Sequence, residues 1–335
     1  MESLFILFIL LLILAYHRKE SEGFPSILDK SMNLSFRGGL ALLIVFHHIS
    51  KVFEFPLSSQ GGIYGETVVG LFFFFSGYGL MMQYMKRGET YLNGLLLNRA
   101  KKLLPSFLII AAIGVLLTYA TGCDLLEMGG GKIGYIIVPN SWYVYVQFYL
   151  YASFVIVGHC VKNKRQMVLG LLVCTIVWVV ICEGIGLGNW WWRSCFAFNT
   201  GIVYTLIEQK KELHEKIANY TIPIVLICMI VAIAIHSIRL RMPFVILLTT
   251  ILPIGLTIIS ERVKMPKNWF LQLFGRVSYE IYLTHGLIIS LINKKYSDLN
   301  VGISIILVIV LSIILSLFIS EINRKIQNIN INNGK

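Results

Sequence analysis

The chain is divided into apolar runs long enough to cross a bilayer. A first run at 3–16 is followed by ten more, at about 37–54, 66–85, 103–121, 141–161, 166–183, 190–207, 219–237, 243–260, 276–292 and 301–320. A membrane-spanning helix needs about 20 mainly apolar residues. None of these runs alternates as the strands of a membrane barrel do, so we expect helices. The sequence predicts an all-α integral membrane protein with about 11 transmembrane helices.

Composition supports this class and excludes another. The 335 residues are 56% hydrophobic and only 14% charged, an apolar share above that of soluble domains. The net charge of +12 comes from lysines and arginines in the short connections, which is the pattern of membrane topology. A nucleic-acid binder would carry a contiguous basic face on a polar domain, so no nucleic-acid partner is expected. The six cysteines have no CxxC spacing, and we predict neither a disulfide framework nor a metal site.

The distribution of basic residues predicts the orientation. With eleven spans, six segments fall on one side and hold 22 lysines and arginines, against 6 on the other side. Those six segments are 17–37, 86–102, 162–165, 208–218, 261–276 and 321–335. This bias predicts a multi-pass protein of the plasma membrane with its N-terminus outside and its C-terminus in the cytoplasm. A cytoplasmic N-terminus with an interfacial first segment fits the charges equally well.

The predicted organisation has three parts. Residues 1–20 form an additional N-terminal transmembrane anchor, 37–320 the membrane domain and 321–335 a cytoplasmic tail. Connections between the spans reach only about twenty residues. Any function is therefore expected within the bilayer or at its edge.

Arg37 and His48 are the most informative ionisable residues. They are eleven residues apart, which is close to three helical turns, so both project from one helix face about 16 Å apart. His47 is rotated by about 100° from that line. Arg37 alone could be a topology anchor and His48 a helix–helix hydrogen bond. Together they favour a site that reaches from the cytoplasmic entry into the membrane.

Two neighbouring segments add candidate residues. In Ser76-Gly77-Tyr78 the glycine permits close helix approach and two hydroxyls lie at depth, which fits a helix contact as well as a site. Arg99 and Lys102 begin the next span, where they serve either as topology anchors or as a cationic clamp for a phosphorylated ligand.

Aromatic and histidine residues later in the chain leave their roles open. Trp142 begins a span on the outer side, where it suits either the interfacial aromatic belt or stacking against a sugar. Tyr279, Tyr282 and His285 follow one another in steps of three, so they form a polar stripe along one helix face. Helix–helix hydrogen bonding explains the stripe as well as a role in a site does.

These residues occur in an order that resembles the family-3 membrane-bound acyltransferases. Arg37 and His48 are similar to that family's arginine–histidine signature, and 70–78 to its Phe-Phe…Ser-Gly-Tyr block. The basic hinge at 99–105, Trp142-Tyr143 and 278–285 are similar to three further landmarks. Each motif is weak alone, but the ordered set is specific and extends over nearly the whole chain. Lys102 stands where many members of that family have a second arginine, and Gln147 stands where one large subgroup has a glutamate.

The resemblance implies a fold and an activity. The fold is a ten-helix acyltransferase core, here with one more N-terminal helix. The activity is O-acylation, with acetyl-CoA as the expected donor and no metal. The acceptor is a hydroxyl of a surface or secreted glycan, or of its lipid-linked precursor, so that polysaccharide of the cell envelope is modified.

The charges suggest roles for the candidate residues within that activity. Arg37, Arg99 and Lys102 would bind the CoA phosphates. His48 would act as general base or carry the acyl group. Supporting roles fall to Ser76, Tyr78, Trp142, Tyr279 and His285.

Two alternatives remain open from the sequence. One is a glycan or lipid transporter without transferase activity, although we find no internal repeat of the kind transporters show. The other shares the chemistry but uses a succinyl donor or a small-molecule acceptor. The sequence does not give the acceptor, the acyl group, the side on which transfer is completed, the role of the first span or the presence of a homo-oligomer.

Overall fold

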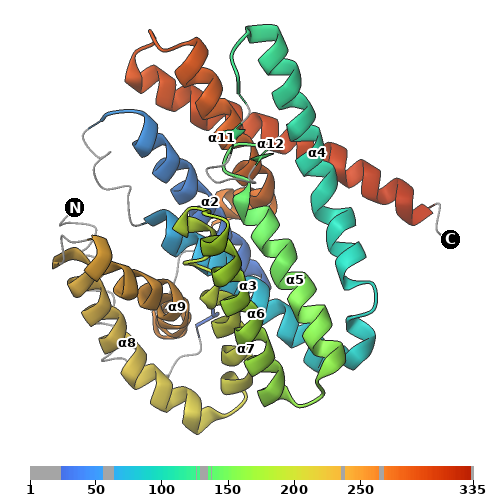
Figure 1. Ribbon diagram of the computed structural model, residues 1–335, viewed down its shortest axis with the longest axis vertical. Coiled ribbons are helices and arrows are strands. Elements are labelled where there is room, and N and C mark those ends of the chain that lie inside the picture. Colours follow the sequence, from blue (N-terminus) through green and yellow to red (C-terminus); the bar gives the residue numbers. More distant parts are fainter. Residues whose placement is uncertain are drawn as a thin grey trace.

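The computed structural model describes residues 24–55, 64–125, 127–128, 135–136, 138–234, 238–263 and 268–332. The predicted span at 3–16 lies outside these residues. The described part folds into eleven α-helices, with a two-residue antiparallel pair between α4 and α5 (Figure 1). The helices are α2 (Lys30–Val52), α3 (Tyr64–Arg87), α4 (Leu95–Thr121), α5 (Trp142–Cys160), α6 (Lys164–Gly184), α7 (Phe196–Glu208), α8 (Lys211–Ala234), α9 (Ile238–Arg262), α10 (Trp269–Arg276), α11 (Ser278–Lys295) and α12 (Val301–Asn332). The short elements are η2 (Gly88–Tyr91), η3 (Asn189–Trp191), β1 (Glu127–Met128) and β2 (Tyr135–Ile136).

The predicted all-α class is confirmed, and each of the ten apolar runs after residue 37 coincides with a helix. Seven described helices are long and apolar enough to cross a membrane, namely α2, α3, α4, α5, α6, α9 and α12. The run at 190–207 differs most from its prediction, because η3 and a turn occupy its start and α7 begins only at Phe196. With 13 residues, α7 is shorter than a span requires.

Several helices turn apolar side chains outward. Leu116 on α4, Val180 on α6 and Ile306 on α12 are each more than 60% exposed. Rows of exposed apolar side chains on long helices are stable against lipid rather than water. The chain is thus a multi-pass membrane protein.

Two pairs of helices touch through their backbones. Figure 1 shows α3 and α7 in the middle of the bundle, with α4 on one side and α8 and α9 on the other. A Cβ on Gly77 would lie 2.1 Å from the carbonyl oxygen of Phe198, and one on Gly201 would lie 2.2 Å from that of Phe74. The predicted close approach at Gly77 is confirmed, because only glycine leaves room for a contact of this kind.

A second contact of this kind joins α2 to α10. A Cβ on Gly38 would lie 1.9 Å from the carbonyl oxygen of Leu271, and one on Gly275 the same distance from that of Leu34. Since Gly38 follows Arg37 directly, this contact fixes the cationic end of α2 against α10 and the start of α11.

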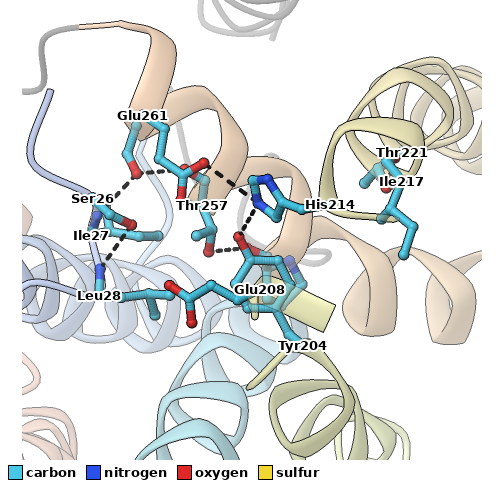
Figure 2. A network of polar contacts seen from close by, with 12 residues as sticks. Ser26, Ile27, Leu28, Tyr204, Glu208, His214, Ile217, Thr221, Thr257 and Glu261 are labelled. Carbon is cyan, nitrogen blue, oxygen red and sulfur yellow. Dashed lines mark hydrogen bonds and ion pairs between the residues drawn. The ribbon is translucent and has the colours of Figure 1, made fainter. Parts of the chain in front are cut away.

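The segment before α2 is held by a polar network between α7, α8 and α9. Figure 2 shows His214 lying between Tyr204 and Glu261; its Nε2 is 2.9 Å from the Tyr204 hydroxyl and 3.6 Å from Glu261 Oε2. The backbone N–H of Ile27 donates to Ser260 Oγ at 2.9 Å, and the Ile27 side chain is fully buried. The chain therefore enters α2 in a fixed position.

The cysteines behave as the sequence predicts with respect to pairing, since all six are free. Their burial is more varied. Cys182, Cys195 and Cys228 are buried, whereas Cys160 is exposed at the end of α5.

Candidate active site

A large cavity of about 1050 Å³ opens between α2, α3, α4, α5, α11 and α12, and we call it the basic cavity. Seven basic and two acidic residues line it. The basic ones are Lys30, Arg37, Lys86, Arg99, Lys102, Arg276 and Arg324, and the acidic ones are Asp29 and Glu280. All three residues predicted to bind a donor, Arg37, Arg99 and Lys102, are thus in one cavity. Such an excess of positive charge attracts a polyanion.

The two predicted arginines are held in place by aromatic rings. The guanidinium of Arg37 lies 5.9 Å from the centre of the Phe72 ring, and that of Arg99 lies 5.2 Å from the centre of Tyr151. Arg37 also donates from Nη2 to Ser278 Oγ at 3.0 Å. Both side chains are half-buried, so they are positioned before any ligand arrives and still have donors to offer it.

Three predicted supporting residues also line the basic cavity. Ser76 Oγ donates to Gln147 Oε1 at 3.3 Å, and the Tyr78 hydroxyl donates to Glu208 Oε2 at 2.9 Å. The Tyr279 hydroxyl donates to the carbonyl oxygen of Leu103 at 3.1 Å. These bonds tie α3 to α5 and α7, and α11 to α4. They fix the wall of the cavity through bonds among five helices.

Glu280 is a residue of this cavity that was not among the sequence candidates. Its side chain is buried, and Oε1 accepts a hydrogen bond of 2.9 Å from Ser106 Oγ. Asn323 Nδ2 donates to the same serine at 2.7 Å. The signal was present in the sequence, since Glu280 is a carboxylate inside the Tyr279–His285 stripe, and carboxylates in such a position are rare without a function.

The last helix contributes to the basic cavity as well. α12 continues to Asn332, well into the segment predicted as a tail from 321. Asn323, Arg324 and Gln327 of this extension line the cavity. Part of the segment predicted as a tail thus belongs to the site.

A second, smaller cavity of about 340 Å³ lies at the other end of α2, and we call it the histidine cavity. Its polar lining is His48, Lys51, Asn140, Ser290 and Lys294. Rings gather beside it: the His48 ring centre is 5.0 Å from that of His285 on α11 and 5.0 Å from that of His47. His47 itself packs toward α3, where a Cβ on Gly65 would lie 2.3 Å from its Nε2.

Aromatic side chains occupy the space between the two cavities. Tyr143, which lines the basic cavity, has its ring centre 5.3 Å from that of Tyr282. The Tyr282 ring centre is in turn 5.8 Å from that of His285. The Tyr282 hydroxyl donates to the carbonyl oxygen of Asn140, a residue of the histidine cavity. A continuous row of rings therefore leads from one cavity to the other.

The structure divides the sequence candidates among the basic cavity, the histidine cavity with its neighbour His285, and a position away from both cavities. Arg37 and His48 are on one helix as predicted, but they line different cavities rather than one, because the row of rings lies between them. His285, at the end of the predicted stripe, meets His48. Trp142 lines neither cavity; it is buried and packs against Trp191, with 6.4 Å between the ring centres.

Metal chemistry has no obvious ligand set in the described residues. Among them there is no group of three or more histidine, cysteine, aspartate or glutamate side chains able to hold one ion.

Comparison with known proteins adds the family. A family model described as an acyltransferase domain matches residues 35–321, most of the chain, and this range includes the whole lining of the histidine cavity and most of the lining of the basic cavity. No curated protein and no solved structure matches. The match covers Arg37, His48 and the later motifs in a single domain, as the resemblance implied, and it identifies the protein as an acyltransferase enzyme. The chain belongs to the family-3 membrane acyltransferases.

Proposed function

We propose that this enzyme is an integral membrane O-acyltransferase that moves an acetyl group from acetyl-CoA to a hydroxyl of a surface or secreted glycan, or of its lipid-linked precursor. The observation that carries the proposal is the placement of two different cavities at the two ends of α2. One offers cations for a phosphorylated donor, and the other offers a histidine to an acceptor.

The basic cavity suits the donor. Coenzyme A carries phosphate groups, and arginine binds phosphate through charge-assisted hydrogen bonds that are about twice as strong as neutral ones. Arg37, Arg99 and Lys102 surround a volume of about 1050 Å³, at the upper end of the range for small-molecule sites. Ser76, Tyr78 and Tyr279 on the same wall would position the donor's arm, and Ser76 and Tyr78 can also offer hydroxyls to the developing oxyanion.

The histidine cavity suits the acceptor. His48 would remove the proton from the acceptor hydroxyl, or carry the acyl group for part of the cycle. An imidazole serves either role because its ordinary pKa lies near the pH at which cells work. Lys51, Asn140 and Ser290 provide donors that can orient a polar acceptor.

The charge distribution gives this arrangement a direction. Lys86, Arg99, Lys102 and Arg276 come from segments that the positive-inside pattern assigns to the cytoplasm, and they line the basic cavity. Lys51 and Lys294 come from segments assigned to the outside, and they line the histidine cavity. The donor would enter from the cytoplasm and the acceptor from outside, in a chain of eleven spans with its C-terminus inside.

The test measures O-acetyl groups on the surface glycan of cells expressing the wild type, His48→Ala or His47→Ala at matched membrane levels. We expect loss with His48→Ala and near-normal acetylation with His47→Ala, which changes the adjacent histidine, rotated by about 100° around α2. Equal acetylation in all three would exclude His48 from the chemistry.

The same experiment separates the alternatives. A wild type that adds no acyl group but redistributes glycan or lipid across the membrane would indicate a transporter. A succinyl group in place of acetyl, or an acylated small molecule, would correct the donor or the acceptor and keep the reaction class.

A further inference from the structure

His285 is one of the described residues with a buried polar side-chain atom that makes no hydrogen bond. It is fully buried on α11, and its Nδ1 lies 2.9 Å from the carbonyl oxygen of Ile281. Because a carbonyl oxygen only accepts, Nδ1 must carry the proton of this bond. The neutral ring therefore has a bare lone pair on Nε2.

That lone pair has no structural use in the described part of the protein. Nε2 of His285 is buried and has no hydrogen-bond partner among the described residues. Leaving a buried polar atom unpaired costs about 1–3 kcal/mol, so such atoms are rare and call for an explanation. A leucine or methionine could fill the space without that cost. The structure thus keeps a basic nitrogen where packing alone does not require one.

The ring of His48 lies next to the ring of His285. The two ring centres are 5.0 Å apart with 39° between the ring planes. At this separation, ring nitrogens that turn toward each other come within hydrogen-bonding distance. His285 is separated from both cavities, since neither has it in its lining. His48 is the histidine through which it can act on the reaction, because His48 lines the histidine cavity.

Resting on the proposed function, we propose that His285 is the positioning residue of a histidine pair. When the His48 ring turns toward it, Nε2 of His285 accepts the N–H of one His48 nitrogen, and the other His48 nitrogen is left to take the proton from the acceptor. In the reaction, the acceptor O–H bond breaks, the new O–C bond forms and the C–S bond of acetyl-CoA breaks. The proton passes from the acceptor oxygen to His48, is stabilised there by His285, and ends on the CoA sulfur. Both histidines are unchanged after one turnover.

The site of His285 offers a matched pair of variants. In His285→Asn the amide nitrogen keeps a donor near the position of Nδ1, toward the Ile281 carbonyl, but nothing replaces Nε2. In His285→Leu both polar groups are removed and the volume is roughly kept. A structural role for His285 would spare the first variant and damage the second, whereas the proposed role damages both.

The experiment uses the full chain purified into liposomes, with acetyl-CoA as donor and de-O-acetylated surface glycan from the expressing cells as acceptor. Release of the CoA thiol gives kcat and KM, and isothermal titration with CoA reports whether the basic cavity is intact. We expect kcat to fall about 10²-fold in both variants, the lower range for loss of a proton acceptor, with CoA affinity and donor KM unchanged. His47→Asn, the same exchange at an adjacent buried histidine, should keep a near-normal kcat.

Two results would overturn the inference. A wild-type kcat in His285→Asn beside an inactive His285→Leu would make His285 a support of the fold. A loss of CoA affinity together with kcat in His285→Asn would likewise indicate that His285 supports the fold. No transfer by the wild type would remove the proposed function, and with it the inference.

Discussion

Different types of side chain surround the two ends of α2. At the Arg37 end, seven basic residues surround a wide cavity, and hydrogen bonds and aromatic faces hold the two arginines in place. At the His48 end, the cavity is about one third of that volume, and the ring of His48, which lines it, lies 5.0 Å from the ring of His285. The first arrangement suits binding of charge and the second suits movement of a proton. Separating the two allows binding energy and chemistry to be altered independently.

The largest effects on kcat and on CoA binding are expected for substitutions at His48 and Arg37. We expect His48→Ala to lower kcat by about 10³-fold, within the range for a general base, while CoA affinity is kept. Arg37→Ala should instead weaken CoA binding and raise the KM for acetyl-CoA. Steady-state kinetics with CoA titration measures both. A fall in kcat alone for Arg37→Ala would show that the two ends are not divided in this way.

The contact between α2 and α10 tests what holds the Arg37 end in place. In Gly38→Ala the new methyl group would meet the Leu271 carbonyl, so we expect a loss of about 1–3 kcal/mol in stability, as for other overpacked sites. Thermal unfolding in detergent measures the change. Gly39→Ala is the matched control, since a Cβ there meets nothing within 4 Å. Equal melting temperatures for both variants would contradict the backbone contact.

Two neighbouring cations on α4 can test whether the basic cavity binds CoA. Arg99 lines this cavity, whereas Lys101, two residues later on α4, is exposed and does not line it. A hydrogen bond to a charged group contributes about 1.5–3 kcal/mol, so Arg99→Ala should weaken CoA binding by about 10- to 100-fold. Lys101→Ala should leave the Kd unchanged. Similar losses in both would mean that surface charge, rather than the cavity, attracts the donor.

The smallest effect is expected at Glu280. Its carboxylate stands in a cavity otherwise rich in cations, so a phosphorylated ligand is repelled by it. In Glu280→Gln the amide oxygen can still accept from Ser106 and the negative charge is lost. CoA should bind a few-fold more tightly, by titration at low ionic strength. Weaker binding would indicate that Glu280 orders the neighbouring cations rather than opposing the ligand.

Much of the fold could be predicted because it depends on local composition. The ten apolar runs after residue 37 became helices, since a bilayer leaves the backbone few other choices. The interruption before α7 was not predicted, because Trp190-Trp191-Trp192 continues the apolar run. Nothing in the hydropathy of this segment marks the 3₁₀ turn η3. Hydropathy measures burial and says little about backbone geometry.

The site was predictable only in part. The spacing of Arg37 and His48 correctly gave one helix, but spacing along one helix cannot show which other helices stand between two side chains. The meeting of His48 with His285 joins residues 237 positions apart, and helix packing alone decides it. The basic cavity was easier to foresee, because a cationic clamp was already one of the two roles that the sequence left open for Arg99 and Lys102.

The backbone contact at Gly38 has a further consequence, because it helps to fix a distance along α2. A rigid helix clamped at one end sets the reach from Arg37 to His48 at about 16 Å, and no rotation of side chains lengthens the backbone between them. Under the proposed function, a donor bound by its phosphates at the clamped end would need an arm of matching reach. The enzyme would select its thioester carrier by length as well as by charge. One residue inserted between Gly39 and Phe46 would turn His48 by about 100° and end that selection.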